Sequence, residues 1–156
     1  RRVTVFKRVG QNIAMEANSR ANDTPSWSVQ VQNWFDEYKD CPKDVINSFR
    51  SPGGPPIGHF TQVVWAVTRF VGCGYTSYET EGGGFRYNKF YTCNYAPMGN
   101  FMGRPVYKTG EACSRCPEGG RCSQSLCSMR GAPKTPPKNQ GDTGGKGGRY
   151  GKRFGR

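Results

Sequence analysis

Apolar residues recur at helical spacing in the stretch between Ser26 and Pro42. Five large side chains form the stripe over three turns: Trp27, Val31, Trp34, Phe35 and Tyr38. This spacing predicts a helix with one buried face. Ser26 or Ser28 is placed to cap its free amides, and Pro42 ends it. Glu37 borders the stripe, where an ordinary solvated carboxylate is the default interpretation.

A second apolar pattern begins just after His59, the only histidine of the chain. The positions that follow it repeat at i, i+3, i+4 and i+7: Phe60, Val63, Val64 and Val67. This order predicts a helical turn with a buried face, while the β-branched valines keep a strand open as an alternative. His59 would lie at the start of this segment, because the preceding Pro55–Gly58 cannot be helix interior.

Two segments rich in aromatic and β-branched residues, 70–78 and 85–95, flank three glycines and predict a β-hairpin. Cys73 and Cys93 are equidistant from Gly83, the middle glycine. If Gly83 is the turn centre, the two cysteines face each other on neighbouring strands, within disulfide range. We therefore expect a Cys73–Cys93 disulfide.

The remaining segments give weaker patterns. Residues 1–9 fit a helix end or a strand, residues 10–16 a tight turn into a buried segment, and residues 17–26 a loop. Residues 41–58 read as a long loop rich in proline and glycine. Asn22-Asp23-Thr24 is a formal glycosylation sequon, but Pro25 follows it and an ordinary surface loop is favoured.

Seven cysteines favour an oxidised, secreted protein over a zinc protein. Four of them form a small knot, Cys113-x2-Cys116-x5-Cys122-x4-Cys127, whose later gaps do not make a second zinc knuckle. An odd total leaves one cysteine without an internal partner. The chain opens on Arg1 rather than Met, so a processed chain or a fragment is expected, and no apolar run approaches the roughly 20 residues that span a bilayer.

The net charge of +12 is concentrated at the C-terminus. Residues 128–156 hold eight basic residues and one acidic residue, and almost no apolar ones, so we expect this tail to be disordered. Its last part, 144–156, interleaves glycine with basic and aromatic residues, which is typical of segments that bind nucleic acid or other polyanions. In a secreted protein heparan sulfate is the favoured partner, and a merely solubilising or degraded tail explains the composition equally well.

Four motifs lie in order along residues 1–107: Gly10-Gln11-Asn12-Ile13, Trp34-Phe35-Asp36-Glu37, Gly58–Thr68 and Phe90–Phe101. Together they resemble the CAP superfamily, and arthropod venom allergen 5-like proteins most. The resemblance implies an α+β fold, an α-β-α sandwich whose first helix would precede Arg1, so the chain looks N-terminally truncated. It further implies a CAP domain over 1–107, a cysteine-rich hinge over 108–127 and the tail over 128–156.

The resemblance also implies disulfides and a cleft. By analogy with the family hinge, the bridges would be Cys113–Cys122 and Cys116–Cys127, with the partner of Cys41 lost upstream. The family cleft holds two histidines and two acids, which in some members bind a divalent metal. His59 and Glu37 match two of these positions, Gln11 stands at the second acid, and the other histidine would lie upstream. For a metal such as zinc, this chain supplies at most half of the ligands.

As a member of such a family, the chain is expected to be a secreted, non-enzymatic protein of venom, saliva or defence. Its ligand would be a small apolar molecule such as a sterol or lipid, or a host or target protein. Phe60, Trp65 and Tyr91 could line a ligand pocket, but core packing is favoured for each.

Three alternatives stay open. One is a metal-dependent secreted protease that uses His59 and Glu37, although no nucleophile is evident and no catalytic residue is assigned. Another is polyanion binding through the tail. The third is an intracellular nucleic-acid-binding protein whose Cys113–Cys127 knot holds a metal, which requires free thiols.

Overall fold

The computed structural model describes residues 6, 8–81 and 84–129. The expectations for residues 1–9 therefore fall mostly outside the described residues, as does the tail from residue 130 onward. The chain divides into two compact units, Arg1–Thr109 and Gly110–Arg156, each described by itself below. Among the described residues, no helix has the length and apolar character needed to cross a bilayer.

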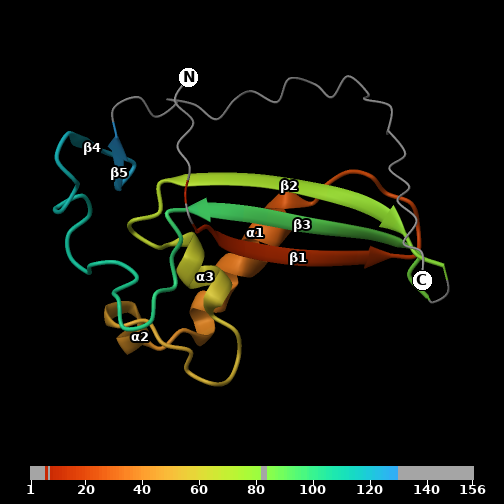
Figure 1. Ribbon diagram of the computed structural model, residues 1–156, viewed down its shortest axis with the longest axis horizontal. Coiled ribbons are helices and arrows are strands. Elements are labelled where there is room, and N and C mark those ends of the chain that lie inside the picture. The colour runs from red at the N-terminus through yellow and green to blue at the C-terminus, as the bar shows by residue number, and fades with distance from the viewer. Residues whose placement is uncertain (1–5, 7, 82–83, 130–156) are drawn as a thin grey trace. The chain divides into compact units, whose positions relative to one another are not determined.

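The first unit is built on a three-stranded antiparallel sheet with the order β1-β3-β2. Figure 1 shows the three long strands, β1 (Gly10–Asn18), β2 (Phe70–Glu79) and β3 (Tyr87–Ala96). The β2–β3 register places Cys73 opposite Cys93, and a disulfide joins them, as the hairpin symmetry predicts. Gly83, the expected turn centre, lies outside the described residues.

β1 differs from the tight turn and buried segment that the sequence suggests. It is a nine-residue edge strand paired along its length with β3, from Gly10 opposite Tyr95 to Asn18 opposite Tyr87. Its side chains alternate between the two faces of the sheet. Pairing with the distant strand, rather than local turn chemistry, sets the conformation, so the expected loop begins after Asn18 instead of at residue 17.

α1 (Trp27–Asp36) is the predicted helix, and a 3₁₀ turn, η1 (Glu37–Asp40), follows it. Its buried face is narrower than the apolar stripe: Trp34 is buried, whereas Val31, Phe35 and Tyr38 are all more than 40% exposed. Ser26 occupies the N-cap position, but its side chain makes no capping hydrogen bond. The capping prediction is therefore wrong for this side chain, whose hydroxyl donates a hydrogen bond to Glu16 instead.

α3 (Gly58–Val63) confirms the helical alternative for the segment around His59. Because the helix ends at Val63, Val67 does not continue the buried face and is 57% exposed. A further helix, α2 (Lys43–Asn47), lies within the stretch expected to be a loop. It contributes to a core cluster whose members come from residues 45–106: Val45, Ile46, Phe49, Ile57, Phe60, Trp65 and Val106.

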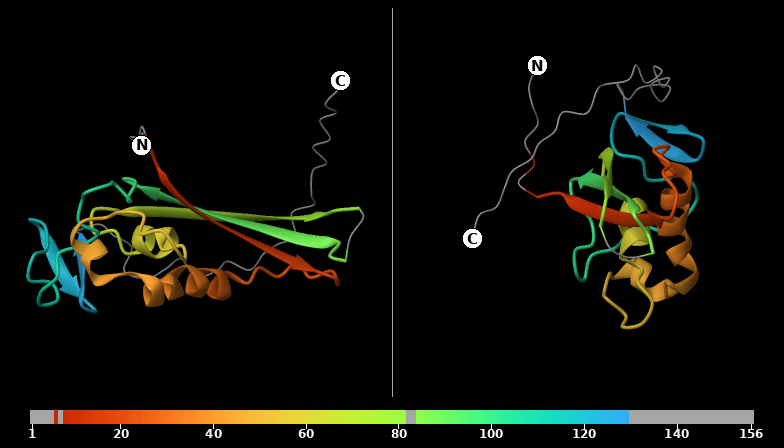
Figure 2. Two further views of the ribbon diagram at one scale, coloured as in Figure 1. Left: turned by 90° about the horizontal axis from the view of Figure 1, so that it is seen from below. Right: turned by 90° about the vertical axis from the view of Figure 1, so that its right-hand side faces the viewer.

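The helices lie against one face of the sheet, as both views in Figure 2 show. Alternate residues of β3 are buried on this face: Lys89, Tyr91, Cys93 and Tyr95. Tyr91, Phe60 and Trp65 are all buried, as core packing predicts. The structure describes one helical layer in this unit instead of the two of a complete α-β-α sandwich. The opposite face, called the open face below, has no helix over it among the described residues of the unit.

The second unit contains a small hairpin, β4 (Gly120–Ser123) paired with β5 (Leu126–Met129). Two disulfides hold it, Cys113–Cys122 and Cys116–Cys127, the pairs that the resemblance implies. Sulfur atoms of Cys113, Cys116 and Cys127 lie within 4.8 Å of one another, but all three are bonded in disulfides. They are not free thiolates, so the zinc-knuckle alternative does not fit this hairpin.

Candidate functional site

Glu37 and His59 meet at the junction of η1 and α3. The Glu37 Oε1 atom lies 2.7 Å from Nδ1 of His59. The second oxygen, Oε2, accepts hydrogen bonds from the backbone amides of His59 at 2.9 Å and Phe60 at 3.1 Å. Both carboxylate oxygens are thus engaged within this one pair of elements.

The arrangement follows from where the two residues lie along the chain. Glu37 begins η1, directly after α1, while His59 and Phe60 lie in the first turn of α3. The first amides of a helix have no partner within the helix, and a carboxylate oxygen from elsewhere can satisfy them. Glu37 therefore caps α3 from outside, in place of the local cap that Ile57 cannot provide.

The neighbours of His59 hold its ring and backbone in place. The Trp34 ring stacks on the imidazole with centroids 6.0 Å apart, and the amide of Asn12 donates to the His59 carbonyl at 3.1 Å. A carboxylate only accepts, so Nδ1 carries the proton in the pair with Glu37, and Nε2 is the other ring nitrogen. The His59 side chain is 36% exposed and that of Glu37 13%.

Gln11 does not join this pair. Its amide donates to Asn94 across β1 and β3 at 2.9 Å, on an exposed part of the sheet. Adjacent strand residues point to opposite faces, so the next residue, Asn12, reaches His59 while Gln11 lies on the open face. Sequence reasoning assigned Gln11 to the cleft and missed Asn12, although both belong to the same Gly-Gln-Asn motif.

The residues present do not fit a metal ion. A zinc site needs three or four ligands, and the described residues bring only His59 and Glu37 together. In the part of the chain that the structure describes, no cysteine or further acidic side chain joins them as a third ligand. Three of the acceptor positions of Glu37 are already taken by the imidazole and the two amides.

The pair resembles two members of a catalytic triad, in which a carboxylate orients a histidine. The third member would be a hydroxyl or thiol beside Nε2, and no hydrogen bond of this kind occurs among the described residues. Cys41 is the free cysteine, and burial raises the pKa of its thiol. A reactive cysteine needs the opposite shift.

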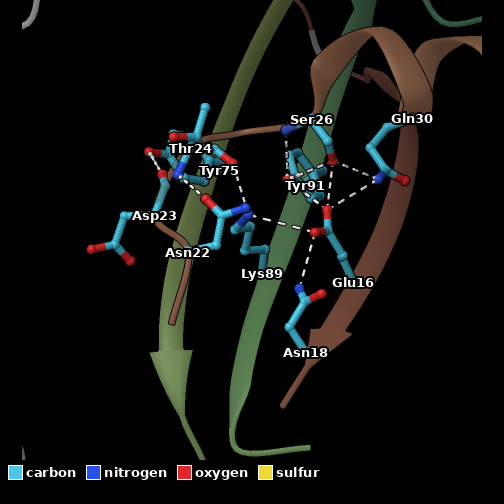
Figure 3. Close-up of polar contacts among 10 residues, drawn as sticks. All are labelled: Glu16, Asn18, Asn22, Asp23, Thr24, Ser26, Gln30, Tyr75, Lys89 and Tyr91. Atoms are coloured by element: carbon cyan, nitrogen blue, oxygen red, sulfur yellow. Dashed lines mark hydrogen bonds and ion pairs between the residues drawn. The ribbon is translucent and has the colours of Figure 1, made fainter. Parts of the chain in front are cut away.

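A second polar cluster surrounds Glu16 of β1, and Figure 3 shows it. Its Oε2 atom accepts hydrogen bonds from the hydroxyls of Ser26 and Tyr91, and Oε1 accepts from Asn18 at 3.0 Å. Gln30 of α1 donates to the Ser26 hydroxyl at 3.1 Å. One carboxylate therefore ties β1 to β3 and to the start of α1.

Lys89 completes this Glu16 cluster. Its side chain is 3% exposed, and its ammonium donates to the Thr24 carbonyl at 2.7 Å and lies 3.5 Å from Glu16 Oε1. The hydrogen bond from Ser26, followed by those from Asn18 and Tyr91, lowers the pKa of Glu16 to about 2. No sequence motif predicts this cluster, because Glu16 and Lys89 face each other only through the β1–β3 register.

Comparison with known proteins identifies the family of this chain. Residues 3–95 match the family described as "Cysteine-rich secretory protein family". The chain is 39% identical over 142 residues to a "CRISP/Allergen/PR-1" protein of Trittame loki, covering 83% of this chain and 34% of that protein. It is 40% identical over 131 residues to "Venom allergen-1" of Aedes albopictus, covering 80% and 49%.

Other relatives agree. A scoloptoxin of Scolopendra dehaani is 38% identical over 119 residues, covering 76% of this chain and 51% of that protein. The crystal structure of Na-ASP-1 superposes with a TM-score of 0.57 at 30% identity, covering 77% of this chain and 30% of that one. The chain thus spans about a third to a half of the length of these curated relatives. It belongs to the cysteine-rich secretory protein family, the CAP superfamily.

Proposed function

We propose that this chain belongs to a secreted, non-enzymatic protein that binds a small apolar ligand on the open face of its sheet. The observation that carries the proposal is a hollow lined by open-face residues of β2 and β3. The contacts of Glu37, with the His59 imidazole and two backbone amides of α3, support a helix-capping role for the His59–Glu37 pair. Three disulfides and the family support secretion, since disulfides persist mainly in oxidising compartments.

The candidate ligand surface is a trough on the open face. It is a hollow of about 600 Å³, and its lining includes Gly72, Gly74, Thr76, Phe90, Thr92 and Asn94. The two glycines leave room because a β-carbon added to either would meet no other atom within 4 Å. The volume lies in the range of small-ligand sites, about 300–1,000 Å³.

Apolar side chains extend this trough along the open face. Ile13 and Met15 of β1 share the face with Phe90 and Thr92, their partners in β3. Met15 is 66% exposed and Ile13 39%, and Phe70, at the start of β2, is 57% exposed. Large exposed apolar surfaces of this kind mark interaction sites, so a sterol or another lipid is the class of ligand we favour.

A fluorescent sterol tests the proposal directly. Gly74→Val places a side chain in the trough without meeting another atom, so the fold is expected to stay intact while sterol affinity falls about tenfold or more. Gly84→Val, at a second open position outside the trough lining, is the matched control. Equal sterol binding by both variants would exclude the trough as the site.

A second candidate function rests on charge. Residues 128–156 carry a net charge of +7, which favours binding of heparan sulfate or another polyanion. Removing these residues should lower the salt concentration at which the protein elutes from heparin. Elution at the same salt with and without them would exclude a polyanion site in the tail.

A further inference from the structure

We propose that a small polar hollow at the hairpin end of the sheet binds a neutral sugar. The hollow has a volume of about 170 Å³ and lies where β1 ends, between the loop of residues 21–23 and the outer parts of β2 and β3. It shares no lining residue with the trough or with the His59–Glu37 pair. This volume corresponds to roughly six water molecules at about 30 Å³ each, which suits one sugar ring rather than a longer ligand.

Several polar atoms around the hollow remain available to a ligand. The Asn18 amide nitrogen donates to Glu16, which leaves the amide oxygen as an acceptor. Asn22 uses its oxygen to accept from the backbone amide of Thr24 at 2.9 Å, which leaves its nitrogen as a donor. Asp23 also lines the hollow, and its carboxylate points away from the Glu16 cluster (Figure 3). Donors and acceptors thus alternate, as the hydroxyls of a sugar require, since each hydroxyl both donates and accepts.

Lys89 supplies a fixed donor at the bottom of this set. Its buried ammonium lies between Glu16 and the Asn22–Thr24 loop (Figure 3). An ammonium has three N–H groups, of which the Thr24 carbonyl takes one and the longer contact with Glu16 a second. We assign the third to a ligand oxygen, because Lys89 lines the hollow and the described hydrogen bonds use only two of the three N–H groups. Burial already sets the position of this donor. A preorganised donor of this kind reduces the ordering cost of binding.

The charges around the hollow select against ligands with a net charge. Lys89 and Arg86 would repel a cation, whereas Asp23 and Glu79 would repel an anion. Arg86 already pairs with Glu79 at 2.8 Å, and Lys89 lies beside Glu16. A neutral polyol can form hydrogen bonds with both the acidic and the basic side chains, and neither kind repels it.

The ring of Tyr87 gives the hollow an apolar component. Tyr87 lines it from β3, on the same face as Lys89, and the Arg86 guanidinium lies 5.8 Å from the centroid of its ring. Tyr78 also lines the hollow, but its side chain lies on the open face, because it pairs with Asn88. Tyrosine offers a large, rigid and amphipathic contact surface at low entropic cost. The C–H face of a sugar ring suits such a surface, while the hydroxyls at its edge suit the amides and the carboxylate.

Saturation-transfer NMR with free monosaccharides tests the proposal on the full chain, after intact mass shows that Asn22 is unmodified. We expect saturable, millimolar binding of at least one of glucose, galactose, mannose and N-acetylglucosamine, with weaker binding of cationic glucosamine and anionic glucuronate. Asp23→Ala should weaken binding about tenfold or more, because a sugar hydroxyl loses a charged acceptor. Asp40→Ala, which removes another exposed carboxylate outside the hollow, should leave binding unchanged.

Ser77→Ala provides a second variant, since Ser77 also lines the hollow on an exposed strand. The amide NMR spectra of the variants verify that each is folded. Absence of saturable binding by any neutral sugar overturns the proposal. So does equal binding by Asp23→Ala, Ser77→Ala and Asp40→Ala, or tighter binding of either charged sugar.

Discussion

The His59–Glu37 pair and the Glu16 cluster each place one carboxylate at a junction, and they differ in how many elements depend on it. Glu37 joins the end of α1 to the start of α3 through one side chain and two amides. Glu16 accepts from side chains of β1, β3 and the start of α1, with Lys89 buried beside it.

The difference shows that a family motif and a structural anchor need not coincide. His59 and Glu37 draw attention because a lone histidine near a glutamate suggests chemistry, yet their geometry is that of a helix cap. Glu16 and Lys89 belong to no site that the sequence suggests, yet they form the more extensively bonded cluster. Substitutions in the two regions should therefore differ in the size and kind of their effects.

The largest effect is expected for Glu16→Ala. The substitution leaves Lys89 as a buried, unpaired charge and removes the acceptor of Ser26 and Tyr91. Breaking a buried ion pair on one side costs about 3–5 kcal/mol in the free energy of unfolding, measured by denaturant unfolding with the disulfides intact. Glu79→Ala, which removes an exposed ion pair with Arg86, is the control and should cost less than about 1 kcal/mol. Equal losses would contradict the anchoring role.

Acid should weaken the Glu16 cluster selectively. The pKa of Glu16 is about 2 in the folded protein against 4.5 for the free side chain, so the fold favours the carboxylate. The resulting stabilisation is present above pH 4.5 and is lost as the pH falls toward 2. Because the Glu16 side chain is 24% exposed, we expect a loss of about 2–3 kcal/mol rather than more.

Denaturant unfolding over this acid range measures the loss, and Glu16→Gln is the comparison. The variant has no carboxyl group to protonate at this position, so the slope of its stability against pH should be shallower. Parallel curves for the wild type and the variant would assign the acid sensitivity to other groups.

A smaller effect is expected at the other carboxylate. Glu37→Ala removes the acceptor of two backbone amides in the first turn of α3 and should cost about 2 kcal/mol in unfolding free energy. His59→Ala keeps the amide hydrogen bonds and should cost about 1 kcal/mol. Thermal or denaturant unfolding distinguishes the two. A larger loss for His59→Ala would mean that the imidazole, rather than the cap, is the main contribution.

Local patterns predicted the fold where neighbours in sequence decide the structure. Cys73 and Cys93 lie on one hairpin, so their symmetric spacing was sufficient to pair them. α3 was predicted from the apolar spacing after His59, but Val67 was assigned to a face that the helix is too short to include. β1 was not recognised as a strand because its paired residues in β3 lie 69 to 85 positions away in sequence.

The same limit applies to the candidate site. His59 and Glu37 were named from motifs, and the structure joins them over 22 residues of separation. The backbone amides of α3 determine which carboxylate oxygens of Glu37 are already hydrogen-bonded. No sequence motif predicts these contacts. Glu16 faces Lys89 only because of the β1–β3 register. The Glu16 cluster therefore could not be predicted without knowing how the strands pair.

The most direct test of the helix-cap role uses the fact that the chain has a single histidine. Long-range ¹H–¹⁵N correlation of the His59 imidazole during a zinc titration reports on both ring nitrogens without ambiguity. With Glu37 holding Nδ1–H and no third ligand beside Nε2, we predict the Nδ1–H tautomer for the neutral ring and an Nε2 shift that zinc leaves unchanged. A saturating zinc-dependent shift of Nε2 that disappears in Glu37→Gln would show a metal site where this account places a helix cap.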